Sequence, residues 1–267
     1  MPGRGSPRPS RHTLAIRHAL IATSLATGLV VAGCGAGVSG PAAAAAPPSP
    51  PTVATQVVQS EPATYTAKIS LPHLTWPADP QAAARVNTAI QSWTARQQTD
   101  FAARVTHSAA AAKNPPASLP PGSLTITYAV GLVTSHVASF RFLVDSQVPG
   151  QADMTQQPAG LTFDLASGAP FTLSGLFQPG KGYLTTLAAA AGTGLAAFSP
   201  AGAHCYLGKA PSATAANFSA WWLSPQGLVL SFQAGIYTAA YCGAPSVTVP
   251  YASVQAAAAT GSPLLGA

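Results

Sequence analysis

The N-terminal segment decides which part of this chain can fold and in which redox environment. Residues 1–17 contain four arginines and no acidic residue, and residues 19–32 form an uncharged run rich in Ala, Leu and Val. A basic head followed by an apolar run of about 7–15 residues is typical of a secretory signal peptide. The run is shorter than the roughly 20 residues that a transmembrane helix needs. The sequence therefore predicts an exported domain.

The end of the apolar run contains a second signal. Val31-Ala32-Gly33-Cys34 resembles a bacterial lipobox, in which small residues precede a cysteine that is lipid-modified and becomes the mature N-terminus. We therefore predict a lipoprotein signal peptide over residues 1–33 and lipidation at Cys34. Lipidation would attach the protein to the outer face of the cytoplasmic membrane or to the cell envelope. The alternative is an ordinary signal peptide that is cleaved nearby, with Cys34 incidental.

Composition divides the exported part into three segments. Residues 34–60 are uncharged and rich in Ala and Pro, and we interpret them as an extended linker. Residues 61–255 have the size of one domain, and we interpret residues 256–267 as a tail.

The net charge of the exported part is small. Without the four arginines of the signal peptide, eight basic residues remain against six acidic ones, a formal net charge of +2, and they form no basic run. This argues against nucleic acid as a partner.

Two cysteines remain in the exported domain once Cys34 is lipidated, namely Cys205 and Cys242. Oxidising compartments favour a disulfide between such a pair. The closed loop of about 38 residues would stabilise the fold by about 4 kcal/mol through chain entropy. The alternative is a nucleophilic cysteine assisted by His204, but no cysteine-protease signature surrounds either thiol. We therefore predict a disulfide between Cys205 and Cys242.

The hydrophobic pattern predicts an α+β domain. Asp79-Pro80 predicts the start of a long helix with Asp79 as its N-cap, and the helix would bury Val86, Ile90, Trp93, Phe101 and Val105. The other predicted elements are strands over 64–71 (ended by Pro72), 124–130, 137–144 and 160–165, a helix over 183–198, a short helix or turn over 217–223, and strands over 227–232 and 247–249 that close the sheet. This irregular order favours a mixed, mainly antiparallel sheet packed against a long helix and shorter helices.

Local signatures of catalysis are absent from the sequence. There is no nucleophile elbow, zinc-protease helix, nucleotide-binding loop or Cys-x-x-Cys pair. The histidines of the exported part have no metal-ligand spacing, so we expect neither a metal nor a cofactor. We therefore predict a protein that is not an enzyme. The alternative is an envelope hydrolase with an unrecognised site, in which one cleft would bring Asp145, Asp164 or a histidine within reach of a serine.

Aromatic residues are concentrated near the C-terminus, where Tyr237, Tyr241 and Tyr251 follow Trp221 and Trp222. Aromatic side chains make favourable contacts at a low entropic cost. The three tyrosines are therefore candidates for a ligand-binding surface. The alternative, and the more common outcome for such a group, is packing in the core.

Several short motifs follow one another in a recognisable order. Phe163-Asp164-Leu165, Gly168, Phe171-Thr172-Leu173 and Leu176-Phe177 are followed by Tyr183-Leu184, Asn217-Phe218, residues 227–232 and residues 247–251. This order resembles the DUF3298 domain, which is shared by RsiV-type anti-sigma factors, MPT64-like secreted antigens of mycobacteria and the companion domain of some peptidoglycan deacetylases. Residues 61–150 resemble the associated DUF4163 region. One departure is Gly175, which replaces the aspartate usual before Leu176-Phe177.

The resemblance implies an extracytoplasmic binding module. RsiV-type domains recognise lysozyme, so the resemblance implies as partner an unknown protein, for example a lysozyme-like one, or a peptidoglycan-related ligand. Neither a cytoplasmic anti-sigma segment nor a deacetylase domain is matched, so neither signalling nor deacetylation is carried over. We therefore predict a non-catalytic cell-envelope lipoprotein that binds a protein or an envelope glycan.

The lipobox motif leads to a direct test of anchoring. In cells that express the protein, metabolic labelling with a fatty-acid analogue should mark the unmodified chain and should fall to background in Cys34→Ala, because the acylated thiol is lost. Undiminished labelling of Cys34→Ala would show that the motif is not a lipidation site.

Overall fold

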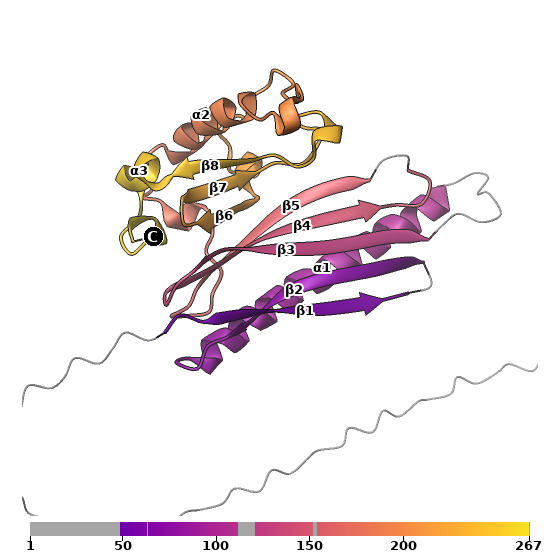
Figure 1. The fold of residues 1–267 in the computed structure, drawn as a ribbon, viewed down its shortest axis with the longest axis horizontal. Coiled ribbons are helices and arrows are strands. Elements are labelled where there is room, and N and C mark those ends of the chain that lie inside the picture. Colours follow the sequence, from indigo (N-terminus) through magenta and orange to yellow (C-terminus); the bar gives the residue numbers. More distant parts are fainter. Residues whose placement is uncertain (1–48, 63, 112–120, 152–153, 267) are drawn as a thin grey trace, which may run out of the picture. The chain divides into compact units, whose positions relative to one another are not determined.

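The computed structural model describes residues 49–62, 64–111, 121–151 and 154–266. The predicted signal peptide and Cys34 lie outside these residues. The described residues form one five-stranded sheet, one three-stranded sheet and several helices (Figure 1). This arrangement confirms the predicted α+β fold with a long helix. Among the described helices, none combines the length and apolar composition that a membrane span requires.

The five-stranded sheet has the order β1-β2-β3-β4-β5. Its neighbouring strands are antiparallel, except that β2 and β3 are parallel. A parallel pair requires a long crossover connection, and the helix α1 provides it between these two strands. The elements are β1 (Thr52–Ser60), β2 (Tyr65–Thr75), α1 (Pro80–Ala111), β3 (Gly122–Val133), β4 (Val137–Gln147) and β5 (Thr155–Asp164).

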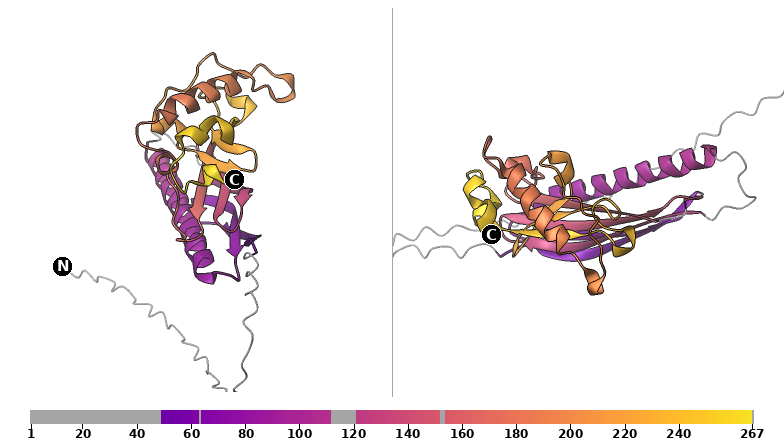
Figure 2. Two further views of the ribbon diagram at one scale, coloured as in Figure 1. Left: turned by 90° about the vertical axis from the view of Figure 1, so that its left-hand side faces the viewer. Right: turned by 90° about the horizontal axis from the view of Figure 1, so that it is seen from above.

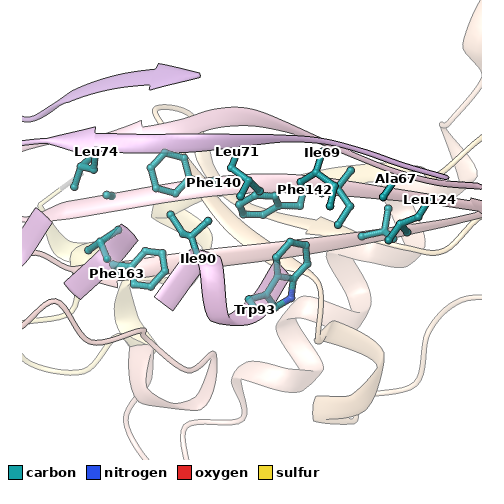
Figure 3. Close-up of a cluster of buried hydrophobic side chains, with 14 of the residues drawn as sticks. Ala67, Ile69, Leu71, Leu74, Ile90, Trp93, Leu124, Phe140, Phe142 and Phe163 are labelled. Carbon is teal, nitrogen blue, oxygen red and sulfur yellow. The ribbon is translucent and has the colours of Figure 1, made fainter. Parts of the chain in front are cut away.

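The helix α1 begins where the sequence predicts. The Oδ1 atom of Asp79 accepts a hydrogen bond from the Ala82 N–H at 2.8 Å, which is the predicted N-cap. All five predicted inward residues are buried. Ile90 and Trp93 point toward Phe140 and Phe142 of the sheet (Figure 3), and the rings of Trp93 and Phe142 are 4.6 Å apart. One face of the sheet is therefore covered by α1, which runs alongside the strands (Figure 2).

Two predicted boundaries in this part are wrong. The strand β1 lies within residues 34–60, which composition assigned to the linker, because its Thr and Val residues favour extended structure despite the Pro-rich segment before them. The strand β2 continues through Pro72 instead of ending there. The ladder between β2 and β3 ends at Ile69, so Pro72 lies where β2 has a neighbour on one side only. A proline is tolerated there because it has no N–H to leave unpaired.

The strands near the C-terminus form a separate sheet instead of closing the first one. This sheet has the order β6-β7-β8 and is antiparallel. The helix α2 buries Leu187, Ala191 and Leu195 against it. The predicted element over 217–223 is split into a short 3₁₀ turn and a strand. The elements are α2 (Tyr183–Ala196), η3 (Ala215–Phe218), β6 (Trp221–Ser224), β7 (Gly227–Ser231), β8 (Ser246–Pro250) and α3 (Tyr251–Val254), with 3₁₀ turns at Ser174–Leu176, Pro200–Gly202, Ala240–Cys242, Gln255–Ala257 and Pro263–Leu265.

The last residues belong to the second core and are not a tail. Leu264 is fully buried, and Ala258 forms a bridge with Phe177. The N–H of Ala259 also donates to the Leu176 carbonyl at 2.9 Å. Leu176 and Phe177, which form part of the motif behind the family resemblance, therefore hold Ala258 and Ala259 in place.

The two sheets meet through small residues on the face of the first sheet opposite α1. A Cβ atom at Gly160 in β5 would overlap the Trp221 backbone in β6, so only glycine fits there. On the adjacent strand β4, the Ser139 hydroxyl accepts a hydrogen bond from the Leu223 N–H at 2.8 Å and lies 2.7 Å from the Thr162 hydroxyl. The backbone of β6 therefore lies directly on the first sheet.

This close approach makes Gly160→Ala strongly destabilising. The added methyl group would push β6 away from the first sheet, and we expect the free energy of unfolding to fall by about 3 kcal/mol or more, as for severe overpacking. Gly192→Ala in α2 is the matched control, since its Cβ would lie 3.2 Å from the Ala210 Cβ, and its effect should stay within about 1 kcal/mol. Urea denaturation of both variants measures the difference, and equal midpoints would contradict the packing argument.

Candidate functional site

The three candidate tyrosines lie in different environments, and Tyr251 is not on the surface. Its side chain is buried, and its hydroxyl donates a hydrogen bond to the Ser224 carbonyl at 2.7 Å. Burial raises the pKa of Tyr251 to about 12. Trp221 and Trp222 are also buried. The prediction of a ligand surface at Tyr251 is therefore wrong, because the residue closes the second core beside the turn between β6 and β7.

Tyr237 and Tyr241 both reach the surface. Tyr241 is 78% exposed, and its hydroxyl donates to the His204 carbonyl at 3.2 Å. Tyr237 is half-buried and packs edge-on against Phe232. The Tyr237 hydroxyl donates to Oδ1 of Asn217 at 3.2 Å, and the Asn217 amide nitrogen donates to Ser212. Tyr237 is therefore held in one orientation.

Cys205 and Cys242 form a disulfide, as predicted, with their Cα atoms 6.0 Å apart. Two backbone hydrogen bonds join the same segments, from the Ala239 N–H to the Cys205 carbonyl and from the Leu207 N–H to the Tyr237 carbonyl. The disulfide thus fastens the segment that contains Tyr237 to the loop that precedes η3.

Tyr237 lies at the edge of a groove that crosses the outer edge of β5. The groove consists of two adjoining depressions, of about 180 and 210 Å³, which share Gln157, Pro158, Ser219 and Ala220. One depression extends to Trp93 and Gln97 on α1, and the other extends to the segment after β7. We call this surface the amide groove, after its polar lining of Gln97, Gln157, Asn217, Ser219, Ser231, Gln233 and Tyr237.

The amide groove is polar but has no charge. No Asp, Glu, Lys, Arg or His is among the described residues that line it. Within the described part of the chain, the side-chain amides of Gln97, Gln157 and Gln233 make no hydrogen bond to another residue. Each amide provides two donors and an accepting oxygen, so the groove can bind a neutral ligand that both donates and accepts hydrogen bonds.

The edge of β5 inside the groove cannot accept another strand. The Thr162 carbonyl and the Asp164 N–H form hydrogen bonds with the segment that follows β5, so they point away from β4. Backbone N–H and C=O groups alternate in direction along a strand, and the even-numbered residues of β5 therefore point theirs outward. Pro158 occupies such an outward position and has no N–H. Next to it, Gly160 is covered by Trp221. Prolines are a common means of protecting the edge of a sheet from strand addition. An extended peptide would therefore find too few backbone N–H and C=O groups to pair with here.

The carboxylates named for the alternative hydrolase do not share a cleft. In the β4–β5 ladder, Asp145 is paired with Gln156 and Asp164 with Val137, which are opposite ends of the ladder, about 26 Å apart at 3.3 Å per residue. Asp164 caps its own turn by accepting hydrogen bonds from the Ala166 N–H and the Ser167 hydroxyl. Burial raises the pKa of Asp145, while Gln156 and Arg141 oppose the shift.

A metal centre is not formed either. Within residues 49–62, 64–111, 121–151 and 154–266, no three His, Cys, Asp or Glu side chains lie close enough together to hold a metal ion. His204 adjoins a disulfide-bonded cysteine, so the pairing of a histidine base with a free Cys205 thiol, considered from the sequence, does not occur.

Sequence reasoning named Tyr237, which lines the groove, but not the amides that accompany it. Gln97 is on α1 and Gln157 on β5, and only the fold brings them to one groove. A weak signal was available in Gln156-Gln157-Pro158, because polar residues beside a proline are typical of an exposed strand edge.

Comparison with solved structures places this fold beside that of the DUF3298 family. A crystal structure of a DUF3298 family member from Bacteroides fragilis aligns with a TM-score of 0.54 and 13% identity, covering 82% of this chain and 98% of the other. A DUF3298 family protein from Pseudomonas aeruginosa aligns with a TM-score of 0.49 and 12% identity, covering 82% and 97% of the two chains. No protein-family model matches the sequence, and no curated protein matches it either. The resemblance predicted from the sequence is confirmed at the level of the fold.

The disulfide leads to a prediction for stability. Replacing Cys205 and Cys242 together by Ser should lower the free energy of unfolding by about 2–4 kcal/mol, because the unfolded chain regains the entropy of an open loop. Chemical denaturation with and without reductant measures the loss, and reductant should affect only the unmodified protein. Two titratable thiols in the denatured, unreduced domain of the protein isolated from its native envelope would contradict the disulfide.

Proposed function

Starting from the fold of a DUF3298 family protein, we propose that this chain is an exported, lipid-anchored binding module that holds an uncharged glycan in the amide groove. The protein binds its ligand without transforming it. Its ligand is a saccharide of the cell envelope, and its anchor is the lipid on Cys34.

The observation that supports a glycan is the chemistry of the groove. Sugar hydroxyls and acetamido groups both donate and accept hydrogen bonds, as the free amides of Gln97, Gln157 and Gln233 do. Each such bond contributes about 0.5–1.5 kcal/mol net, so several are needed for useful affinity. The uncharged lining offers no partner to an ionised ligand, and burying an unpaired charge is costly.

The same groove is poorly suited to a protein ligand. A peptide that adds to a sheet needs an unbroken row of backbone donors and acceptors, and Pro158 interrupts that row in β5. A folded protein partner favours an apolar centre with aromatic anchors, whereas Trp93 and Phe232 are almost fully buried. Of the two ligand classes expected from the sequence, the glycan is the one that we propose.

The anchoring part of the proposal is supported by the sequence. A basic head, an apolar run and Val31-Ala32-Gly33-Cys34 precede the domain, and an intramolecular disulfide is typical of proteins in oxidising compartments. The charged fraction of only 7% also suits a domain that is held at a surface and does not need high solubility.

Binding to chitohexaose, a neutral N-acetylated hexasaccharide, tests the proposed function. We expect saturable binding by isothermal titration to the protein purified from membranes, and no binding to its fully deacetylated, cationic counterpart. Gln97→Ala with Gln157→Ala should weaken the affinity about 10-fold, since two hydrogen bonds are lost. Gln226→Ala, an exposed glutamine outside the groove, should leave the affinity unchanged.

The opposite results identify the alternatives. Equal affinity of the groove variant and the control would show that the glycan binds elsewhere. Capture of a muramidase by a protein that does not bind chitohexaose would favour the protein ligand. Cleavage of the oligosaccharide during the titration would favour a hydrolase.

A further inference from the structure

The sequence protects one outer edge of the five-stranded sheet from strand addition and leaves the other unprotected. The edge of β5 is blocked by Pro158 and covered at Gly160. The edge of β1 has neither protection. Its nine residues, TVATQVVQS, contain no proline and no charge. Native proteins commonly place Lys or Pro on such an edge, because an open edge is a template for another strand.

Both faces of β1 are partly exposed at its centre. Val57 is 57% exposed and Val58 is 36% exposed, and successive residues of a strand point to opposite faces of the sheet. The outer edge is therefore accessible in the middle of the strand, and both faces are partly exposed there, although the Tyr128 hydroxyl lies 2.7 Å from the Thr55 hydroxyl on one of them. The residues Thr52, Val53, Thr55, Val57 and Val58 are β-branched, which favours pairing with another strand.

We propose that β1 pairs with β1 of a second copy of this chain, in antiparallel orientation about a two-fold axis at Gln56. The two five-stranded sheets then form one continuous sheet. Gln56 faces Gln56 of the second copy, and Thr55 and Ala54 face its Val57 and Val58. Pairs of β-branched residues opposite each other stabilise such a ladder. No charged pair opposes it, since β1 has no charge.

The helices leave room for this arrangement. The helix α1 packs mainly on β2, and a two-fold axis perpendicular to the sheet places both copies of α1 on the same face. The two β2 strands are then separated by two β1 strands, a distance of about 14 Å at the usual strand spacing. Helices are about 10–12 Å across, so the two copies of α1 do not overlap where each lies on its own β2.

The proposed anchor favours the second copy over other occupants. β1 begins at Thr52, 18 residues after Cys34, and that length of chain spans at most about 60 Å when extended. Lipidated copies would therefore hold their β1 edges in one thin layer at the membrane, where the effective concentration of partners is high. This high local concentration depends on the anchoring proposed above, whereas the pairing itself is independent of the groove.

Site-specific crosslinking in native membranes tests the register. Gln56→Cys places two cysteines opposite each other, within the Cα separation that a disulfide allows, and mild oxidation should give about tenfold more covalent dimer than in the unmodified protein. Gln59→Cys is the matched control, because Gln59 faces Val53 and lies about 20 Å from its own copy at 3.3 Å per residue. The double variant Val53→Cys with Gln59→Cys should again crosslink. Equal dimer yield from Gln56→Cys and Gln59→Cys would overturn the proposal.

A charge on the edge provides the second test. Val57→Lys should reduce the crosslinking of Gln56→Cys about tenfold, because two lysines would lie within the new ladder. Thr186→Lys adds the same charge to an exposed position on α2 and should have no effect. Thermal unfolding of Val57→Lys, compared with that of the unmodified protein, confirms that the variant is folded. Unchanged crosslinking of a folded Val57→Lys, or crosslinking by Gln56→Cys to a different protein, would show that a second copy does not occupy this edge.

Discussion

The contact between β6 and the first sheet at Gly160 is the constraint on which the rest of the molecule depends. It brings the Trp221 backbone onto β5 and the Leu223 N–H onto Ser139. Each of the two sheets has its own covering helix, α1 or α2, and neither helix joins them. Because the joint consists of backbone and small side chains, it tolerates almost no added volume. The relation between the two cores is therefore set by this contact together with the neighbouring ones at Gly131 and Val137.

The amide groove is a consequence of that contact. Where β6 leaves the edge of β5, the residues on either side, Gln157 and Ser219, remain uncovered and face a common space. The opposite wall is held by the disulfide and by the hydrogen bond from Tyr237 to Asn217. The wall at Tyr237 therefore loses little conformational entropy when a ligand binds, whereas the side chains of Gln157 and Gln233 become ordered only on binding.

Local signals in the sequence predicted the parts of this fold that depend on local physics. The start of α1 followed from a capping aspartate and a proline, and its buried face followed from the helical period. The disulfide followed from the count of cysteines in an exported chain. By contrast, β1 was hidden by the composition of the segment before it, and Tyr251 was misplaced because tyrosine suits a core and a surface equally well. The groove could not be predicted, since Gln97 and Gln157 are brought together only by tertiary packing.

The burial of the last residues has a consequence for biogenesis. Leu264 and Ala258 complete the second core against Leu176 and Phe177. A chain that crosses a membrane from its N-terminus onward would present α1 and the first five strands outside while these residues are still in the translocation channel. The first core can close early, but the second has to wait until residues 258–264 have emerged from the channel. The two cores would then form one after the other, in the order of the chain.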